Sequence, residues 1–360
     1  MMPNLKSLAL SCILLSLPIF NTIYFISGYK LYIVFFIISS FLLSLWVTKI
    51  DKYIFIYFIT MTCLLLVNSL VIHAKFSFDI LFLISSILII TIAVENKKTY
   101  ILFEIPLYAL LVTLLTLYIV FGYRYTNFNG LGINSQKSIN YISALLTFGL
   151  IGYCISRHFR EKRVSFIILC LYLYESYFLY SRTSIVISLL VFALCLPYTS
   201  LFKNRLGILF ILLFIATPLI VYFKFDTIQE LMLSTKWKKG FDTPRFSLWT
   251  DYYNSLDLTS LFFGSNLNDI SSIANFAGNP HNSFITLFSK VGIIGFTLTF
   301  LLYIYNVNFM VKNKQYLFVL LSLIMILRIF FDKLIFFGTY DYYFMFFLIS
   351  FSFKNKIVNT

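Results

Sequence analysis

His281, in the stretch Pro280-His281-Asn282, is the residue of this chain best suited to chemistry. Asn279 can cap a helix and Pro280 can occupy its first position, which predicts that His281 lies in the first helical turn. At that place unpaired backbone N–H groups and the positive end of the helix dipole attract phosphate and disfavour an imidazolium cation. A neutral imidazole there could accept a proton from a hydroxyl group while a phosphate is bound beside it. The alternative is a structural histidine that only lines the interface.

Two glycines follow His281 inside an otherwise apolar segment. They are Gly292 and Gly295, and they begin eleven residues after the histidine. Small residues at this spacing predict a helix face on which a neighbouring helix packs closely. His281 is therefore expected at the mouth of a membrane helix.

Two arginines lie where predicted membrane helices begin or end. Arg182 stands in the turn Tyr180–Ser184, and Arg328 lies about one helical turn from the outer end of its span. Charges inside a membrane are costly and usually face a cavity or a partner. The guanidinium fork can bind two phosphate oxygens at once, so we expect an anion-binding cavity here. The alternative for Arg328 is a structural pair with Asp332, four residues further on.

The longest polar segment, Lys224–His281, spans 58 residues between the ninth and tenth predicted spans. Within it, Thr243-Pro244 predicts a helix start, which would place Arg245 and Trp249 on one helix face. Polar segments of this length usually have a function. The alternative is an amphipathic helix on the lipid headgroups. In that case anionic lipid would contact the loop lysines, Lys236, Lys238 and Lys239.

The composition excludes a soluble domain. The chain of 360 residues is 60% hydrophobic and only 12% charged, whereas soluble domains carry about 25% charged residues. The net charge of +14 could suggest nucleic acid, but the basic residues form no stripe outside the loops. We therefore expect an all-α polytopic membrane protein, a single integral membrane domain over residues 1–360, with no nucleic-acid partner.

About twelve apolar runs are long enough to cross roughly 30 Å of hydrocarbon. They lie near Leu8–Ser27, Leu31–Thr48, Tyr53–Ile72, Phe78–Val94, Tyr100–Gly122, Ile139–Ser156, Val164–Tyr180, Ser184–Phe202, Leu206–Phe223, Ser283–Asn306, Tyr316–Phe331 and Leu334–Phe353. Residues 224–281 then form one large extracytoplasmic loop.

Orientation follows from the basic residues in the short loops. With the N-terminus in the cytoplasm, 15 Lys and Arg residues lie inside and 6 lie outside. Cytoplasmic loops carry the excess of Lys and Arg, so both termini are expected in the cytoplasm. The five cysteines fall within predicted spans without CxxC spacing, and they are expected to be small buried hydrophobes rather than disulfide or metal ligands.

Four motifs of the second half resemble, in type and order, those of the bacterial O-antigen polymerase and ligase superfamily. These are the turn Ser181-Arg182-Thr183, the Arg245 segment with Trp249, the turn Gly264-Ser265, and the signature from Pro280-His281-Asn282 to Gly295. The first half of the chain is similar to that family only as a set of spans.

The resemblance implies a metal-independent membrane glycosyltransferase without cofactor, which takes an undecaprenyl diphosphate-linked oligosaccharide at the outer face of the bacterial cytoplasmic (inner) membrane. His281 would be the catalytic base or would position the acceptor. Arg182, Arg245 and, as a further candidate, Arg328 would bind the diphosphate. Trp249 and Asn282 would contact the glycan. Membrane lipids and a chain-length regulator are the partners that the resemblance allows.

Polymerase is the preferred form of this resemblance. Ligases commonly carry a second histidine two residues before the His-Asn pair, where this chain has Asn279. The stretch Tyr-Asp-Tyr-Tyr from Tyr340 also looks more like polymerases. The alternatives are an O-antigen ligase that transfers glycan to the lipid A core and a lipid-linked oligosaccharide flippase. A transporter usually shows a repeat of two halves, and we find none in this sequence.

Lys290 departs from the family pattern, which often has a glutamate at this position. At 1.5 Å per residue, Lys290 would lie well inside the membrane and needs an anionic partner. We expect Glu175 as that partner, or else Glu104.

Overall fold

The computed structural model describes residues 31–42, 52–72, 79–95, 101–121, 139–179, 182–199 and 244–349, together with eight single positions between 12 and 50. These residues are mostly helical, and their only β-type pairing is one isolated bridge between Val164 and Thr199. The predicted span Leu206–Phe223 and most of Leu8–Ser27 lie outside the described residues. So does the part of the outer loop before residue 244, with Lys236, Lys238 and Lys239.

The apolar helices coincide with most of the predicted spans. They are α2 (Leu31–Leu42), α3 (Lys52–Val71), α4 (Asp79–Glu95), α5 (Ile101–Phe121), α6 (Ile139–Phe159), α7 (Phe166–Phe178), α8 (Arg182–Cys195), α14 (Ser283–Lys312), α15 (Tyr316–Phe330) and α16 (Asp341–Ile349). Among the described residues, three segments are long and apolar enough to cross a membrane: Lys52–Val71, Asn140–Phe159 and Ser283–Lys312. The total of about twelve spans stays a prediction.

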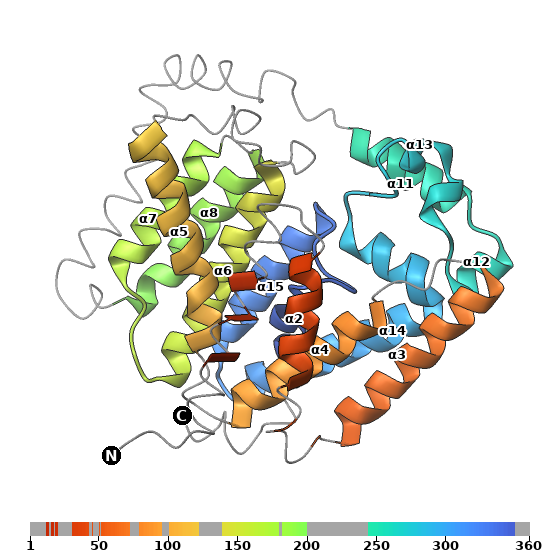
Figure 1. Cartoon of the computed structure of the whole chain (residues 1–360), viewed down its shortest axis with the longest axis horizontal. Helices are drawn as coiled ribbons and strands as arrows, with labels where there is room; N and C mark the ends of the chain where they lie inside the picture. The colour runs from red at the N-terminus through yellow and green to blue at the C-terminus, as the bar shows by residue number, and fades with distance from the viewer. Residues whose placement is uncertain are drawn as a thin grey trace.

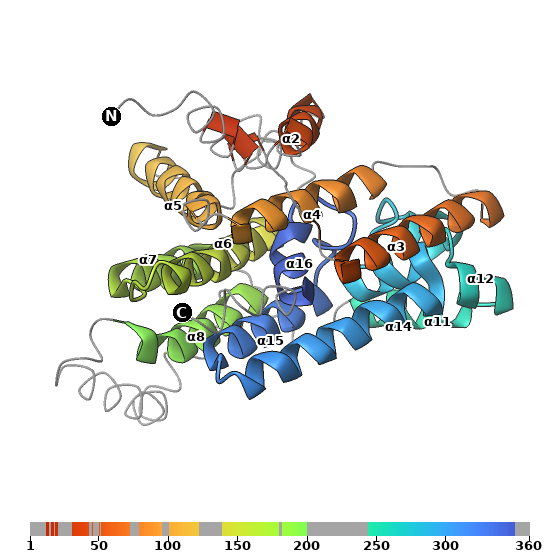
Figure 2. The same cartoon turned by 90° about the horizontal axis from the view of Figure 1, so that it is seen from below.

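The helices pack around α16, which is buried along its whole length. α16 contacts α4, α6, α14 and α15, and it lies between them in Figure 2. Aromatic rings fill this centre: Phe346 meets Phe103, Phe159 and Phe318 at centroid distances of 6.2, 5.9 and 5.7 Å. A helix that is apolar on every side is suited to such a central position.

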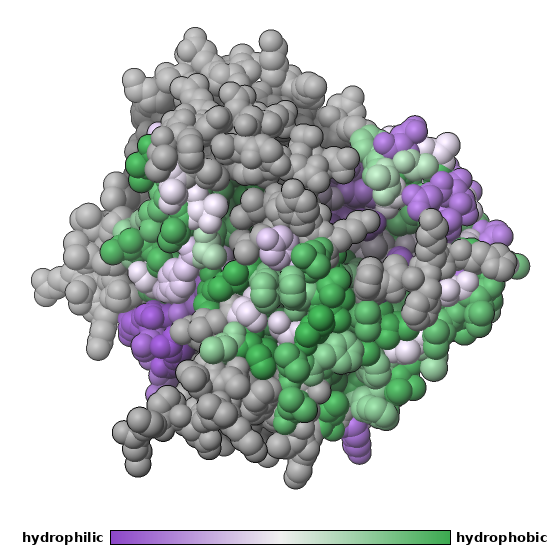
Figure 3. Space-filling view, in the orientation of Figure 1, coloured by the Kyte–Doolittle hydropathy of each residue, from purple (hydrophilic) through white to green (hydrophobic). Residues whose placement is uncertain are grey.

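Three short helices of the predicted outer loop gather at one end of α3 and α14 (Figure 1). They are α11 (Pro244–Asn254), α12 (Leu258–Phe263) and α13 (Ser271–Ala274). In Figure 3, hydrophilic residues cluster over this end and again near the distant meeting point of α6 and α7, with hydrophobic surface between. The two polar zones agree with two faces of a membrane, and their assignment to outside and inside rests on the loop charges.

A kink in α14 receives the end of α12. Gly292 has φ 60° and ψ −167°, a backbone conformation that interrupts the helix and that side chains disfavour. A Cβ atom on Gly292 would lie 1.9 Å from the carbonyl oxygen of Phe262 in α12. Gly295, one turn later, lies against Leu64 of α3. The expected close helix packing is therefore present at Gly295. At Gly292 the missing side chain instead leaves room for the backbone of α12.

The carbonyl group of Ser289 is released from the helix by this kink and is satisfied by the loop. It accepts hydrogen bonds from the Ser265 backbone N–H at 2.9 Å and from the Asn68 side-chain amide at 3.3 Å. The same amide donates to the Phe263 carbonyl at 2.6 Å. One side chain of α3 thus joins α12 to α14.

The helix of the last predicted span begins later than expected. Helix was predicted from residue 334, but the backbone is irregular until α16 begins at Asp341. One local and one distant side chain satisfy the irregular segment: the Asp341 carboxylate accepts the N–H groups of Phe337 (2.6 Å) and Gly338 (3.0 Å), and the Ser283 hydroxyl of α14 accepts that of Leu334 (3.1 Å). Non-helical backbone among membrane helices is stable only where protein buries and satisfies it in this way.

The cysteines follow the prediction only in part. Cys154 and Cys195 are buried, with their sulfur atoms 3.9 Å apart, whereas Cys12 and Cys63 are exposed. A small apolar side chain needs no protein cover on a helix face that contacts lipid, so position within a span does not imply burial in the protein.

Candidate functional site at the start of α14

His281 lies in the loop before α14 and not in its first turn. The helix begins at Ser283 and its N-cap is Asn282, whose side-chain oxygen accepts the N–H groups of Phe284 (2.8 Å) and Ile285 (3.2 Å). The predicted cap, Asn279, instead accepts the backbone N–H of His281 at 2.9 Å. The prediction was wrong because two asparagines compete for the same local role, and the second one wins.

The backbone of His281 is held in an unusual conformation. Its φ of 53° lies in the left-handed region, which is uncommon outside glycine although histidine is enriched there. Such conformations persist when the surrounding structure fixes them, and they concentrate at functional sites.

Four different parts of the fold fix the neighbours of His281. The Lys333 amine, between α15 and α16, donates to the Gly278 carbonyl at 3.0 Å. The Asn279 amide contacts the hydroxyl of Tyr141 in α6. The Trp249 indole N–H, in α11, donates to the Pro280 carbonyl at 2.9 Å. The fourth part is the N-terminal end of α14, which is capped by the side chain next to the histidine.

The imidazole itself is half-buried and available. Its ring packs edge-on against Phe276 with centroids 5.7 Å apart. Within the described part of the chain, neither ring nitrogen has a hydrogen-bond partner. Burial lowers the pKa of His281 below its usual 6.5, and the nearby cations Arg245 and Lys333 lower it further, while Asp332 acts in the opposite direction. The imidazole is therefore neutral at physiological pH, as a proton acceptor must be.

Asp332 draws two arginines to this end of the molecule. Its Oδ2 atom lies 2.9 Å from Nη1 of Arg328, and its Oδ1 atom lies 3.6 Å from Nη2 of Arg245. The Arg328 and Asp332 side chains are 0% and 1% exposed, whereas Arg245 is 16% exposed. Only Arg245 of the two arginines can therefore meet a ligand without a rearrangement.

Arg328 also holds α15 against α6. Its Nη2 atom donates to the Asn140 carbonyl at 2.6 Å and to the Ser143 hydroxyl at 3.3 Å. The structural pair with Asp332 that was weighed as the alternative is therefore present. Diphosphate binding by Arg328 stays a prediction.

Trp249 and Asn282 have structural partners. Trp249 is 8% exposed and packs edge-on against Phe246 (5.2 Å) and Phe330 (5.1 Å), so the α11 helix that carries Arg245 is pinned to α15 and to the histidine loop. The side-chain oxygen of Asn282 is occupied by the helix cap. Glycan contact by these two residues stays a prediction. The predicted helix is present as α11, and its turns put Arg245 and Trp249 on one face, whereas the predicted cap Thr243 lies outside the described residues.

Lys290 is paired with Asp79, not with Glu175 or Glu104. The Lys290 amine lies 2.6 Å from the Asp79 carboxylate at the start of α4. Glu104 belongs to the other end of the bundle, where it pairs with Arg160 at 3.2 Å. Lys290 lies at the same level of the bundle as the first turn of α4, where Asp79 is. This pairing could not be predicted because the local sequence does not show which helices are neighbours.

Arg182 begins α8, but its side chain lies outside what the structure describes, so its role stays a prediction. Conversely, sequence reasoning missed Tyr141 and Lys333 as site residues. Lys333 is embedded enough that burial, with help from nearby Lys290, lowers its pKa to about 8 against the opposing effect of Asp79. In the sequence, the position of Lys333 next to Asp332 could have indicated that it belongs to the site, whereas nothing in the sequence around Tyr141 does so.

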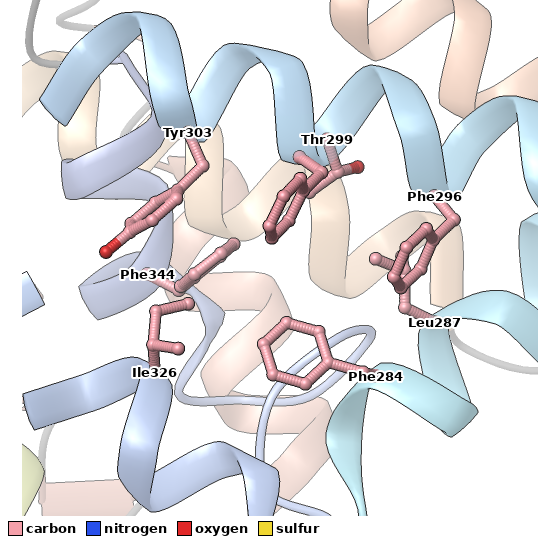
Figure 4. A pocket seen from close by; sticks show the side chains of 8 residues that line it. Phe284, Leu287, Phe296, Thr299, Tyr303, Ile326 and Phe344 are labelled. Carbon is pink, nitrogen blue, oxygen red and sulfur yellow. The ribbon is translucent and has the colours of Figure 1, made fainter. Parts of the chain in front are cut away.

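A small apolar hollow lies beside this site, between α14, α15 and α16. Figure 4 shows Phe296 and Phe344 on opposite sides of it, with Tyr303 stacked beside Phe344. Its cavity volume of about 10 Å³ is at the lower limit for one water molecule. This hollow is too small to hold a sugar ring.

The site therefore combines a neutral histidine free to accept a proton, an accessible arginine, and more positive than negative charge. Within the ranges described, no group of three His, Cys, Asp or Glu residues is placed to hold a metal ion. Comparisons of the chain with protein-family models, with curated proteins and with solved structures gave no match.

Proposed function

We propose that this protein is a surface-polysaccharide polymerase of the O-antigen type, which transfers a glycan from undecaprenyl diphosphate onto a lipid-linked repeat unit. The observation that carries the proposal is the convergence of His281 and Arg245 beside Asp332, at the end of the bundle to which the loop charges assign the outside. A neutral base next to an accessible cation suits a reaction in which a hydroxyl is deprotonated and an anion leaves.

In the proposed reaction, the hydroxyl oxygen of the acceptor's terminal sugar attacks the anomeric carbon of the donor. The bond between that carbon and the diphosphate oxygen breaks, and the lipid diphosphate leaves with the bonding electrons. The hydroxyl proton passes to a ring nitrogen of His281. The leaving group is already an anion, so it needs a cation rather than a strong acid, and Arg245 supplies one.

Asp332 gives the proposed site a resting partner for Arg245. At 3.6 Å the Arg245 pair is looser than the 2.9 Å pair of Arg328 with the same carboxylate. A diphosphate can therefore take over Arg245 while Arg328 keeps Asp332 neutralised. The proposal includes Arg182 as a second diphosphate ligand, both termini in the cytoplasm, and a chain-length regulator as partner.

Deletion of the gene, followed by electrophoresis of the surface glycan, tests this function. A polymerase deletion leaves a band of a single repeat unit, and complementation with the His281→Ala variant should fail to restore the ladder. A ligase deletion would instead leave polymer on the carrier lipid, and a flippase deletion would leave single repeats trapped inside. Either of these two results would exclude a polymerase.

A further inference from the structure

A second hollow, which unlike the first has polar walls, lies at the opposite end of the bundle from His281. It is bounded by the turn between α6 and α7, by the short helix η4 (Leu196–Tyr198) that follows α8, and by the start of α15. Its volume is about 360 Å³, and its walls include His158, Lys162, Arg163, Tyr198 and Leu317. It has no part in the proposed transfer reaction.

Hydrogen bonds between the two connecting segments hold the walls of this hollow. The Val164 N–H donates to the Tyr198 carbonyl at 3.1 Å, and the Arg163 guanidinium donates to the Thr199 carbonyl at 3.3 Å. The Arg157 Nε–H donates to the Arg163 carbonyl at 2.8 Å. The hollow is thus a built feature of the fold rather than a gap between loose turns.

Positive charge dominates the rim. Arg160 is engaged by Glu104 at 3.2 Å, which neutralises that carboxylate. Among the described residues that line the hollow, Lys162 and Arg163 are accompanied by one acidic residue, the exposed Glu161, and Arg157 adds a further cation next to them. An anion is the ligand that this balance attracts.

The floor of the hollow offers a polar group and an apolar wall. The His158 ring lines the hollow, its side chain hydrogen-bonds to Gln315, and its buried Nε2 atom has no partner within hydrogen-bond geometry among the described residues. Tyr198 and Leu317 provide apolar surface beside it. Ile167, in the first turn of α7, is 69% exposed nearby, and the helix carries only apolar and aromatic side chains up to Tyr174.

We propose that this hollow binds the phosphate headgroup of an anionic phospholipid. The basic rim would hold the phosphate, and the acyl chains would run along the apolar first turns of α7. Basic pockets between membrane helices at the cytoplasmic face are suited to such headgroups. The loop charges assign this end to the cytoplasm, where the anionic leaflet lies. The inference does not depend on the polymerase proposal.

Binding can be measured on the purified full-length protein in detergent by native mass spectrometry. Phosphatidylglycerol is the probe, phosphatidylcholine is the neutral lipid, and inorganic phosphate represents a free anion. The test variant is Lys162→Gln with Arg163→Gln. The matched control is Lys52→Gln with Lys312→Gln, which removes two exposed lysines at the same end of the bundle but outside the hollow.

The test variant should bind phosphatidylglycerol on the order of tenfold more weakly than the wild type, because each basic contact contributes substantially near a lipid surface. The control should change less than about twofold. Equal losses in both variants would show nonspecific charge attraction, and equal binding of phosphatidylcholine would show no headgroup selection. Inorganic phosphate that competes as well as the lipid would identify a free anion as ligand. Each of these results would overturn the proposal.

Arg163 also supports the fold through Thr199, so a second variant separates binding from folding. Lys162→Glu removes no hydrogen bond of the described structure and reverses one rim charge. It should weaken phosphatidylglycerol binding while the melting temperature in neutral lipid is unchanged. Wild-type affinity in Lys162→Glu would refute the assigned rim.

Discussion

Replacing Gly292 by alanine should separate the outer loop from the membrane helix that it docks on. The new Cβ atom would lie 1.9 Å from the Phe262 carbonyl oxygen, although real Cβ contacts essentially never fall below 3.0 Å. Helix α12 must therefore retreat by at least 1.1 Å, the difference between these two values. The φ of 60° remains unfavourable for alanine even after that movement.

The magnitude follows from what this movement breaks. The bond from the Ser265 N–H to the Ser289 carbonyl measures 2.9 Å, and that from Asn68 to the Phe263 carbonyl measures 2.6 Å, so a retreat of this size stretches both beyond useful length. Backbone strain costs about 1–3 kcal/mol. Buried polar groups left unpaired cost about 1–3 kcal/mol each. Gly292→Ala should therefore destabilise the protein by about 3–6 kcal/mol, allowing for partial relaxation.

Thermal unfolding of the purified protein in detergent measures this effect, with Gly338→Ala as the control. A Cβ atom on Gly338 would meet its nearest neighbours at ordinary distances of 3.5 and 3.7 Å. Gly292→Ala should lower the melting temperature on the order of 10 °C, while Gly338→Ala should change it by about 2 °C or less. Equal melting temperatures for the two variants would refute the docking of α12 into the kink.

Further predictions concern the site and its orientation. His281→Ala should fold normally but polymerise about 10²–10⁴-fold more slowly, as expected for a lost general base, and His281→Gln should not restore the rate because an amide cannot take a proton. Arg245→Lys should lower the rate on the order of tenfold or more, because an ammonium group cannot bind two phosphate oxygens as a fork does. The rate should stay constant down to pH values below 6.5, since the pKa of His281 is lowered and the neutral base persists. Donor binding should weaken above about pH 8, where Lys333 loses its proton and the cluster loses positive charge. Cysteine at the exposed position Asn275 should react with an impermeant thiol reagent from outside, whereas cysteine at exposed Lys162 should not.

Specific results would contradict each of these expectations. Polymer of normal length from His281→Ala at normal expression would make the histidine structural, and full rescue by glutamine would reduce it to positioning. A wild-type rate in Arg245→Lys would remove Arg245 from the diphosphate site. An acid limb above pH 6.5 would show that the imidazole is not the neutral base. Reversed labelling of the two cysteines would place the histidine loop in the cytoplasm.

Hydropathy predicted the positions of helices whose ends are determined by their own sequence. The runs near Tyr53–Ile72 and Phe78–Val94 match α3 and α4 within one or two residues. It did not predict the irregular backbone before Asp341, because those residues are as apolar as a helix. The side chains that satisfy the unwound segment belong partly to α14, as Ser283 does. Local hydrophobicity predicts that a segment is buried, but a buried segment can be either a helix or an irregular loop whose backbone groups are hydrogen-bonded by the surrounding protein.

The site was predictable where a residue's role is local. The helix from Pro244 puts Arg245 and Trp249 on one face whatever surrounds it. The partners of that face were harder to predict from the sequence. Asp332 was recognised as a partner of Arg328, four residues away, but its second contact, with Arg245, depends on tertiary packing. The pairing of Lys290 with Asp79 has the same origin.

The anchoring of the histidine loop by separate helices has a genetic consequence. Tyr141, Trp249 and Lys333 lie far apart in the sequence, yet each holds a neighbour of the same histidine. Because all three act through one short loop, their substitutions share a single effect and combine non-additively. In a random mutant library, substitutions at these three positions would therefore give the same phenotype. A second-site mutation that suppresses the defect of one substitution would tend to suppress the defects of the other two as well.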